Sequence, residues 1–182
     1  MRIRTERALI LAVDFQAKLL AMLGLERSQG LLQRSLRLLA SGQGLQIPIL
    51  LSVQNPQGLG PLLAELGDFG EALPKTTFSC VATPNIRKQL QAHPERRQIL
   101  LLGVETHICI LQTALELQDL GWQPVIVRDC VESREHQQKD WALERMTQAG
   151  ITLCSSESLF YELLGSSDHF LFRELAPHWR KQ

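Results

Sequence analysis

The sequence has few aromatic residues and no excess of either charge, and each shortage narrows what the chain can be. Aromatic residues make up 5% of the 182 positions, and 19 Lys and Arg are balanced by 19 Asp and Glu. A chain with zero net charge lacks the excess of Lys and Arg that binds nucleic-acid phosphates, so we do not expect nucleic acid as a partner. The 45% hydrophobic share excludes disorder as a description of the whole chain.

Long hydrophobic runs and paired cysteines are also missing. No apolar run approaches the ~20 residues of a membrane span, and residues 1–7 alternate in charge instead of opening a signal peptide. We therefore expect a cytoplasmic protein with no membrane partner. The cysteines are too far apart for a Cys-x-x-Cys motif, which fits reduced thiols; they are Cys80, Cys109, Cys130 and Cys154.

Short apolar runs indicate the strands. The three strongest are nearly continuous instead of alternating, as expected for strands that are covered on both faces of a parallel sheet. They are Ala8–Val13, Ile47–Val53 and Ile99–Val104, and weaker candidates follow at Pro124–Val127 and Ile151–Cys154.

Helical periodicity appears between these runs, with stripes that include Leu31 and Leu39, Ile108 and Leu115, and Ala142 and Met146. The alternation predicts a three-layer α/β/α fold, a Rossmann-like open and mainly parallel sheet of about five to six strands. We expect one domain over residues 1–182. The segment 54–70 is predicted as a loop with one short helix, and the tail 165–182 is predicted to pack on the body or on another subunit.

Several familiar site patterns are missing. The sequence has no phosphate-binding GxxxxGK[ST] loop, no GxSxG elbow, no GxGxxG turn after a strand and no HExxH pair. We therefore expect neither a cofactor nor a metal ion.

Chemically useful residues follow two of the predicted strands. Asp14 ends the first, and Cys109 lies in the first turn of the helix after Ile99–Val104, where unpaired backbone N–H groups favour a thiolate. Cys109 is thus a candidate nucleophile. Each residue also has a plainer interpretation: Cys109 as a buried core residue, Asp14 as a helix cap, and Lys75 as a solvated loop lysine.

Taken together, these residues resemble the isochorismatase-like cysteine hydrolases. The matching segments are ALILAVDFQ at 8–16, LPKTTFS at 73–79 and residues 101–134, of which GVETHICILQTAL at 103–115 is the most specific. The resemblance extends from about residue 8 to residue 164. Within the family, the chain is most similar to small isochorismatase-domain proteins whose substrate is unassigned.

The resemblance implies a triad of Asp14, Lys75 and Cys109. In that scheme Asp14 moves the proton, Lys75 stabilises the thiolate, and Cys109 attacks an acyl carbon. It also implies a cis peptide bond between Val104 and Glu105, and an oxyanion hole formed by the backbone N–H groups of Glu105 and Cys109.

Other positions depart from the family pattern or invite alternatives. Nicotinamidases of this family carry an Asp-x-His metal site after the second strand, where this chain has Ser52-Val53-Gln54-Asn55-Pro56, so the resemblance implies no catalytic metal here. Gln54 and Phe15 are predicted to contact substrate. Gln54 can also be read as a residue that merely closes the loop, and His107 is predicted to make local contacts only.

The sequence therefore predicts a metal-independent cysteine hydrolase that acts on a small amide, carbamoyl or related molecule. Association into a homo-oligomer, a dimer or a tetramer, is expected from the family and from the apolar tail. Two alternatives remain: a redox-active thiol protein that works by oxidation of Cys109, and a binding or assembly module that kept the fold without hydrolysis.

Overall fold

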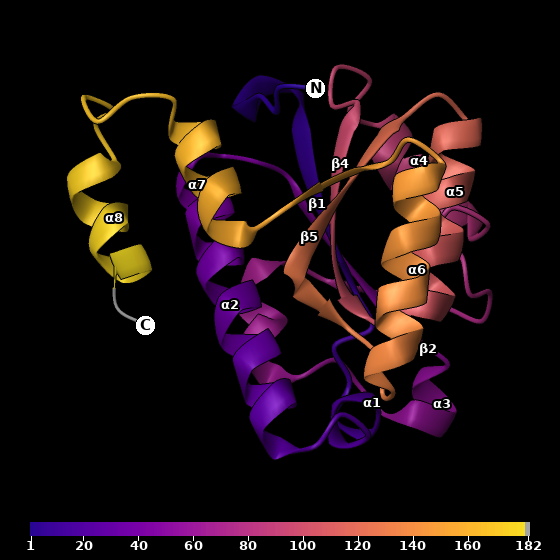
Figure 1. The fold of residues 1–182 in the computed structure, drawn as a ribbon. Coiled ribbons are helices and arrows are strands. Elements are labelled where there is room, and N and C mark those ends of the chain that lie inside the picture. The colour runs from indigo at the N-terminus through magenta and orange to yellow at the C-terminus, as the bar shows by residue number, and fades with distance from the viewer. Residues whose placement is uncertain (181–182) are drawn as a thin grey trace.

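The computed structural model describes residues 1–180, which form six strands and the helices around them (Figure 1). The strands are β1 (Ala8–Val13), β2 (Ile49–Gln54), β3 (Ala72–Lys75), β4 (Gln98–Val104), β5 (Gln123–Glu132) and β6 (Thr152–Cys154). The α-helices are α1 (Ala17–Ala21), α2 (Leu25–Gly44), α3 (Pro56–Leu59), α4 (Pro84–Gln91), α5 (Leu111–Asp119), α6 (His136–Gln148), α7 (Ser156–Leu164) and α8 (Phe172–Arg180). Two 3-10 helices, Thr5–Arg7 and Ala64–Phe69, and a π-helix, Thr106–Ile110, complete the described elements.

The six strands form one parallel sheet in the order β3-β2-β1-β4-β5-β6. Helices cover both faces, which gives the three-layer α/β/α arrangement that the alternating pattern predicts, so the predicted fold is confirmed (Figure 1).

β1 shows why its sequence is continuously apolar. All six of its residues are buried, and alternate side chains enter different cores. Ala8, Ile10 and Ala12 pack in the core under α2, α7 and α8, whereas Leu9, Leu11 and Val13 pack in the core under α4, α5 and α6. A strand buried on both faces needs no polar alternation.

β3 is the strand that the apolar runs of the sequence do not predict. It is a four-residue edge strand that contains Pro74, and proline removes a backbone donor that an inner strand would need. An edge position tolerates this loss because one side of the strand has no partner. β5 is longer than predicted, since it continues from Val127 through the polar residues Arg128 and Asp129 to Glu132.

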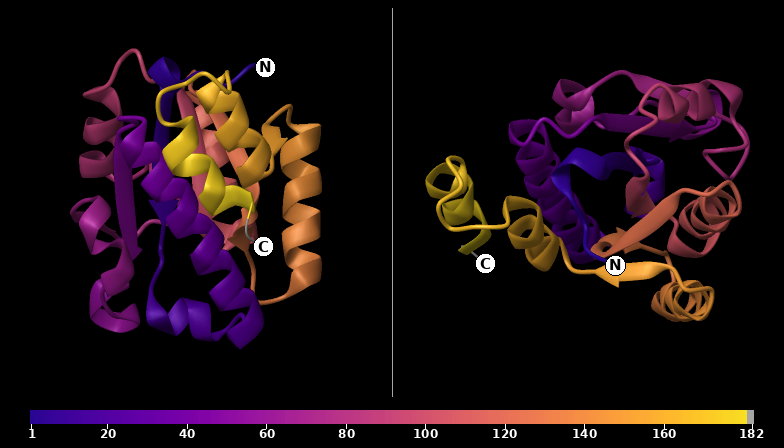
Figure 2. Two further views of the ribbon diagram at one scale, coloured as in Figure 1. Left: turned by 90° about the vertical axis from the view of Figure 1, so that its left-hand side faces the viewer. Right: turned by 90° about the horizontal axis from the view of Figure 1, so that it is seen from above.

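The tail packs on the body of the same chain. Figure 2 shows α8 as the outermost helix, beside α2 and α7. The Trp179 ring stacks on Phe160 of α7 at 4.9 Å between centroids, and its indole N–H donates to Ser41 of α2 at 3.1 Å. Of the two predictions for the tail, packing on the body is therefore the one that the structure shows.

A single glycine allows β4 to approach β1 closely near their carboxyl ends. Gly103 has a φ of +119°, and a Cβ atom at this position would lie 2.0 Å from the Val13 carbonyl oxygen. Because the obstacle is backbone, it cannot rotate away as a side chain could. Gly103 therefore sets how closely the end of β4 lies against Val13 and Asp14.

We predict that Gly103→Ala lowers the free energy of unfolding by on the order of 3 kcal/mol or more, through the backbone clash and the unfavourable φ. Urea unfolding of the purified variant measures this loss. Gly67→Ala is the matched control, since a Cβ there meets no atom within 4 Å and the residue has no positive φ. Equal stability of the two variants would contradict the prediction.

Candidate active site

The strand order changes direction between β1 and β4, and functional residues gather at the carboxyl ends of the strands there. Asp14 follows β1 directly, and Lys75 is the last residue of β3. Cys109 lies in the π-helix Thr106–Ile110, which begins two residues after β4 ends. Open α/β sheets bind ligands outside the carboxyl ends of their strands at such a switch point.

Asp14, Lys75 and Cys109 are brought into contact. The Lys75 Nζ lies 2.7 Å from Asp14 Oδ2 and 3.6 Å from Cys109 Sγ. The exposed fractions of the three residues are 0%, 3% and 6%, respectively. Charged groups this deeply buried require a partner, because an isolated ion is strongly destabilised away from water.

The backbone presents Asp14 in an uncommon conformation. Its φ of +59° lies in the left-handed region, where residues other than glycine are rarely found. Ser52 of β2 holds it twice: the Ser52 carbonyl accepts from the Asp14 N–H at 3.1 Å, and the Ser52 hydroxyl donates to Asp14 Oδ1 at 2.8 Å. The carboxylate is therefore bound through both oxygens.

Lys75 remains an ammonium despite its burial. Burial lowers its pKa, but the facing groups of Cys80, Asp14 and Cys109 raise it more, so the pKa lies above the usual 10.5. The ammonium also donates to Gln54 Oε1 at 2.5 Å and faces the carbonyl oxygens of Thr77 and Phe78, each at 3.4 Å.

The resting state of Cys109 differs from the sequence expectation. Burial, followed by the charge of Asp14, raises the pKa of the thiol to about 12, and Lys75 offsets only part of this rise. The helix start does not make a thiolate, since a buried thiol facing a carboxylate keeps its proton. Asp14 is placed to take that proton, because the Lys75 ammonium contacts both the carboxylate and the thiol.

Glu105 uses its side chain and backbone separately. The peptide bond between Val104 and Glu105 is cis. The carboxylate accepts from the backbone N–H of Arg134 at 2.9 Å and pairs with the Arg134 guanidinium, whereas the sequence analysis considered no contact with Arg134. Within residues 1–180, the backbone N–H of Glu105 has no hydrogen-bond acceptor, so it is available to another group.

Both residues that are predicted to contact substrate are buried. Phe15 is completely buried in the core under α2, so its ring has no surface open to a ligand. Its expected contact with substrate is therefore corrected. Gln54 is 9% exposed, and it bonds Lys75 through Oε1 and the Thr76 carbonyl through Nε2 at 2.9 Å. Gln54 thus binds protein groups through both ends of its amide.

Two further residues belong to this cluster, and the sequence analysis gave them no role at the site. Ser52 binds Asp14, and the Cys80 thiol lies 3.5 Å from the Ser52 hydroxyl. A signal was present, since Ser52 interrupts an otherwise apolar strand. His107 contacts Ser133, with Nδ1 3.0 Å from Oγ, and does not bond Cys109.

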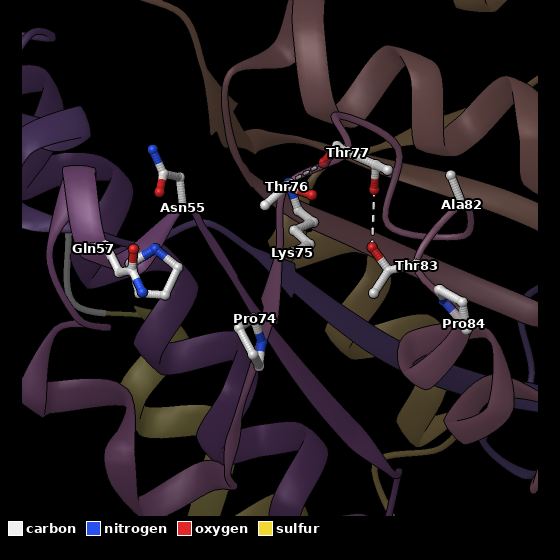
Figure 3. A pocket seen from close by; sticks show the side chains of 10 residues that line it. Asn55, Gln57, Pro74, Lys75, Thr76, Thr77, Ala82, Thr83 and Pro84 are labelled. Atoms are coloured by element: carbon white, nitrogen blue, oxygen red, sulfur yellow. Dashed lines mark hydrogen bonds between the residues drawn. The ribbon is translucent and has the colours of Figure 1, made fainter.

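A cavity of about 410 Å³ opens beside Lys75 (Figure 3). Its polar lining is otherwise uncharged and comes from Asn55, Gln57, Thr76, Thr77 and Thr83. Figure 3 also shows the bond between the Thr77 and Thr83 hydroxyls, which are 2.9 Å apart. Asn55 and Gln57 belong to the long segment 54–70, so this segment forms part of the cavity wall.

Two kinds of feature are absent from the described part of the chain. No three His, Cys, Asp or Glu side chains among residues 1–180 are grouped so that they could hold a metal ion. None of the helices in that range combines the length and apolar character needed to cross a bilayer.

Known proteins with similar sequences carry the same domain. "Isochorismatase domain-containing protein 2" of Bos taurus is 44% identical over 140 residues, which cover 76% of this chain and 68% of the bovine protein.

Solved structures agree. A structure named MAR1 ribonuclease from Caenorhabditis elegans has a TM-score of 0.89 and 30% identity, covering 98% of this chain and 92% of that one. The YcaC gene product of Escherichia coli is described as an octameric hydrolase of unknown specificity. Its structure has a TM-score of 0.84 at 22% identity, and the match covers 98% of this chain and 96% of that one. At this identity the likeness shows the fold alone. The model of the isochorismatase domain family matches residues 8–158. The chain therefore belongs to the isochorismatase domain family.

Proposed function

We propose that this protein is a cysteine hydrolase that cleaves a small amide, carbamoyl or related substrate without a metal ion or cofactor. The observation that carries the proposal is a single buried ammonium, Lys75, in contact with both a carboxylate, Asp14, and a thiol, Cys109. These are the groups that acyl transfer to a thiol requires: a nucleophile, a base that accepts its proton, and a cation that stabilises the negative charge.

The reaction proceeds by general base catalysis. Asp14 accepts the Cys109 proton as the sulfur attacks the acyl carbon, and the carbonyl electron pair moves onto oxygen. When the tetrahedral intermediate collapses, Asp14 returns the proton to the leaving nitrogen, and a thioester-type intermediate remains on Cys109. Asp14 then deprotonates water, which attacks the intermediate and releases the acid and the free thiol. Lys75 stays charged throughout.

The negative oxygen of the intermediate needs donors that are already in place. The backbone N–H groups of Glu105 and Cys109 are the candidates, and the unengaged Glu105 N–H supports this assignment. Donors of this kind typically contribute ~10²–10³ in rate each. The Glu105 side chain serves a different purpose, since its pairing with Arg134 anchors the residue.

The raised pKa of Cys109 argues against the redox alternative. The thiolate is the species that peroxide oxidises, and burial beside Asp14 keeps the thiol protonated. The binding-module alternative does not explain why a lysine, a carboxylate and a thiol are buried in mutual contact, since apolar residues of similar size would be the simpler way to fill the space.

The cavity beside Lys75 favours a small substrate with uncharged polar groups. Its hydroxyl and amide groups can hydrogen-bond such a molecule. Lys75 is the only charged residue in the lining, and its side chain is fully buried and paired with Asp14. We further propose that the protein works in the cytoplasm as a homo-oligomer, a dimer or a tetramer, and light scattering of the purified protein tests the assembly. Four free thiols fit a reducing compartment.

A screen of small amides and carbamoyl compounds tests the reaction. We expect turnover by the native protein, its loss by at least ~10³-fold in Cys109→Ala, and no change after treatment with a chelator. Given the name of the C. elegans structure, RNA is included, and we expect no cleavage of it because the chain carries no net charge. Turnover that survives in Cys109→Ala would contradict the proposal.

The charges around Cys109 predict opposite effects of two substitutions on its alkylation. Asp14 raises the pKa of the thiol and Lys75 lowers it. Below the pKa of about 12, Asp14→Asn should therefore speed alkylation of Cys109 by iodoacetamide, and Lys75→Met should slow it, whereas both should abolish turnover. Peptide-resolved mass spectrometry measures the rates. Changes of the same sign in both variants would contradict this electrostatic account.

A further inference from the structure

Two buried polar side chains on β2 contact the charged pair. Ser52 and Gln54 are two positions apart, so they lie on the same face of the strand. Ser52 is 0% exposed and Gln54 is 9% exposed. A buried polar group needs hydrogen-bond partners, and these two find theirs on Asp14 and Lys75.

Counting protons fixes the direction of the bonds at Ser52. A hydroxyl has one proton, and the ionised Asp14 carboxylate can only accept, so Ser52 donates to Asp14 Oδ1. The lone pairs of the hydroxyl then face the Cys80 thiol, whose sulfur lies 3.5 Å away. Burial raises the pKa of Cys80, so this thiol keeps its proton and can donate. The bonds therefore run from Cys80 to Ser52 to Asp14.

The same counting applies to the Lys75 ammonium, which has three protons. Its two shortest contacts are Asp14 Oδ2 at 2.7 Å and Gln54 Oε1 at 2.5 Å. Three acceptors lie farther away: the carbonyl oxygens of Thr77 and Phe78, each at 3.4 Å, and Cys109 Sγ at 3.6 Å. Because an ammonium is tetrahedral, acceptors that hold two of the protons determine where the third one points. Gln54 thus limits rotation of the ammonium and holds this proton on the side of the remaining acceptors, Cys109 among them.

We propose that Ser52 and Gln54 are positioning residues, which hold Asp14 and Lys75 in the orientation that Cys109 chemistry requires. They act through these two residues and do not touch the substrate. The inference deepens the proposed function and depends on it, because without chemistry at Cys109 there is nothing to position.

Removal of either side chain should reduce the reactivity of Cys109. Without the Ser52 hydroxyl, the Asp14 charge is less balanced and opposes the thiolate more strongly. Without Gln54, the ammonium of Lys75 can rotate, and its third proton is no longer held on the side where the sulfur lies. A hydrogen bond to a charged group is worth about one tenfold step, so we expect each loss to slow Cys109 alkylation about tenfold at a fixed pH.

The experiment measures Cys109 alkylation by iodoacetamide against pH, resolved by peptide, in the full-length protein. Ser52→Ala and Gln54→Met should be about tenfold slower than the native protein, with the rate profile displaced to higher pH by about one unit. Ser52→Thr keeps the hydroxyl and should restore the native profile. Two matched controls lie outside the site, the buried Ser35→Ala and the exposed Gln89→Met, and should leave the profile unchanged.

A purely structural role has a different signature. It would lower the melting temperature and increase labelling of the fully buried Cys130, which reports opening of the fold, but leave the pH profile of Cys109 in place. That result would overturn the proposal. Should Gln54→Met not fold, Gln54→Glu keeps the shape, places a second negative charge on Lys75 and should also slow the reaction; a native rate in that variant would equally overturn it.

The Asp14→Asn and Lys75→Met variants separate this proposal from the proposed function. If they change Cys109 alkylation while the Ser52 and Gln54 variants do not, positioning fails and the hydrolase proposal stands. If none of the four changes it, the hydrolase proposal fails at its nucleophile, and the positioning proposal fails with it.

Discussion

The ion pair between Lys75 and Asp14 is buried, and the rest of the site is arranged around it. Neither side chain has any exposed surface, and taking each ion out of water costs about several kcal/mol. Their mutual attraction recovers this cost only with good geometry and further hydrogen bonds. The protein supplies them: Ser52 binds the second carboxylate oxygen, and Gln54 binds the ammonium. Loss of one partner from such a pair costs about 3–5 kcal/mol, so the stability of the fold depends on both residues being present.

The parallel sheet makes this arrangement possible. Asp14, Gln54 and Lys75 end or directly follow three neighbouring strands, β1, β2 and β3, so the sheet itself sets their spacing. Cys109 lies in the segment after β4, on the other side of the switch point between β1 and β4. Gly103 lets that strand lie against Val13. A shift of β4 relative to the strands that carry Asp14 and Lys75 would separate the thiol of Cys109 from the ammonium of Lys75.

Much of the fold can be predicted from the sequence, because strands that are buried on both faces of the sheet have continuous apolar runs. β1 and β4 are predicted within one residue of their bounds for this reason. β3 is not, because a short edge strand with Pro74 lacks both length and apolar character. Nothing in its residue types distinguishes it from a loop.

The candidate site can be predicted from the sequence only in part. Asp14, Lys75 and Cys109 are identified by the family resemblance, and the structure places them in contact. Contacts made by side chains from distant segments are not predictable from residue types, which is why Arg134 as the partner of Glu105 was missed. The pKa of Cys109 depends on features of the same kind, because the sequence reveals its place at a helix start but not its depth of burial or the neighbouring Asp14 charge.

The central claim is that Cys109 rests as a neutral thiol and loses its proton to Asp14 only during the reaction. Thiolate absorbance at about 240 nm, measured against pH as the difference between the native protein and Cys109→Ser, tests it directly. The account predicts no Cys109 thiolate at neutral pH and a rise only in strongly alkaline solution, towards the pKa of about 12. A full thiolate signal at neutral pH would contradict it, since Asp14 would then have no proton to accept.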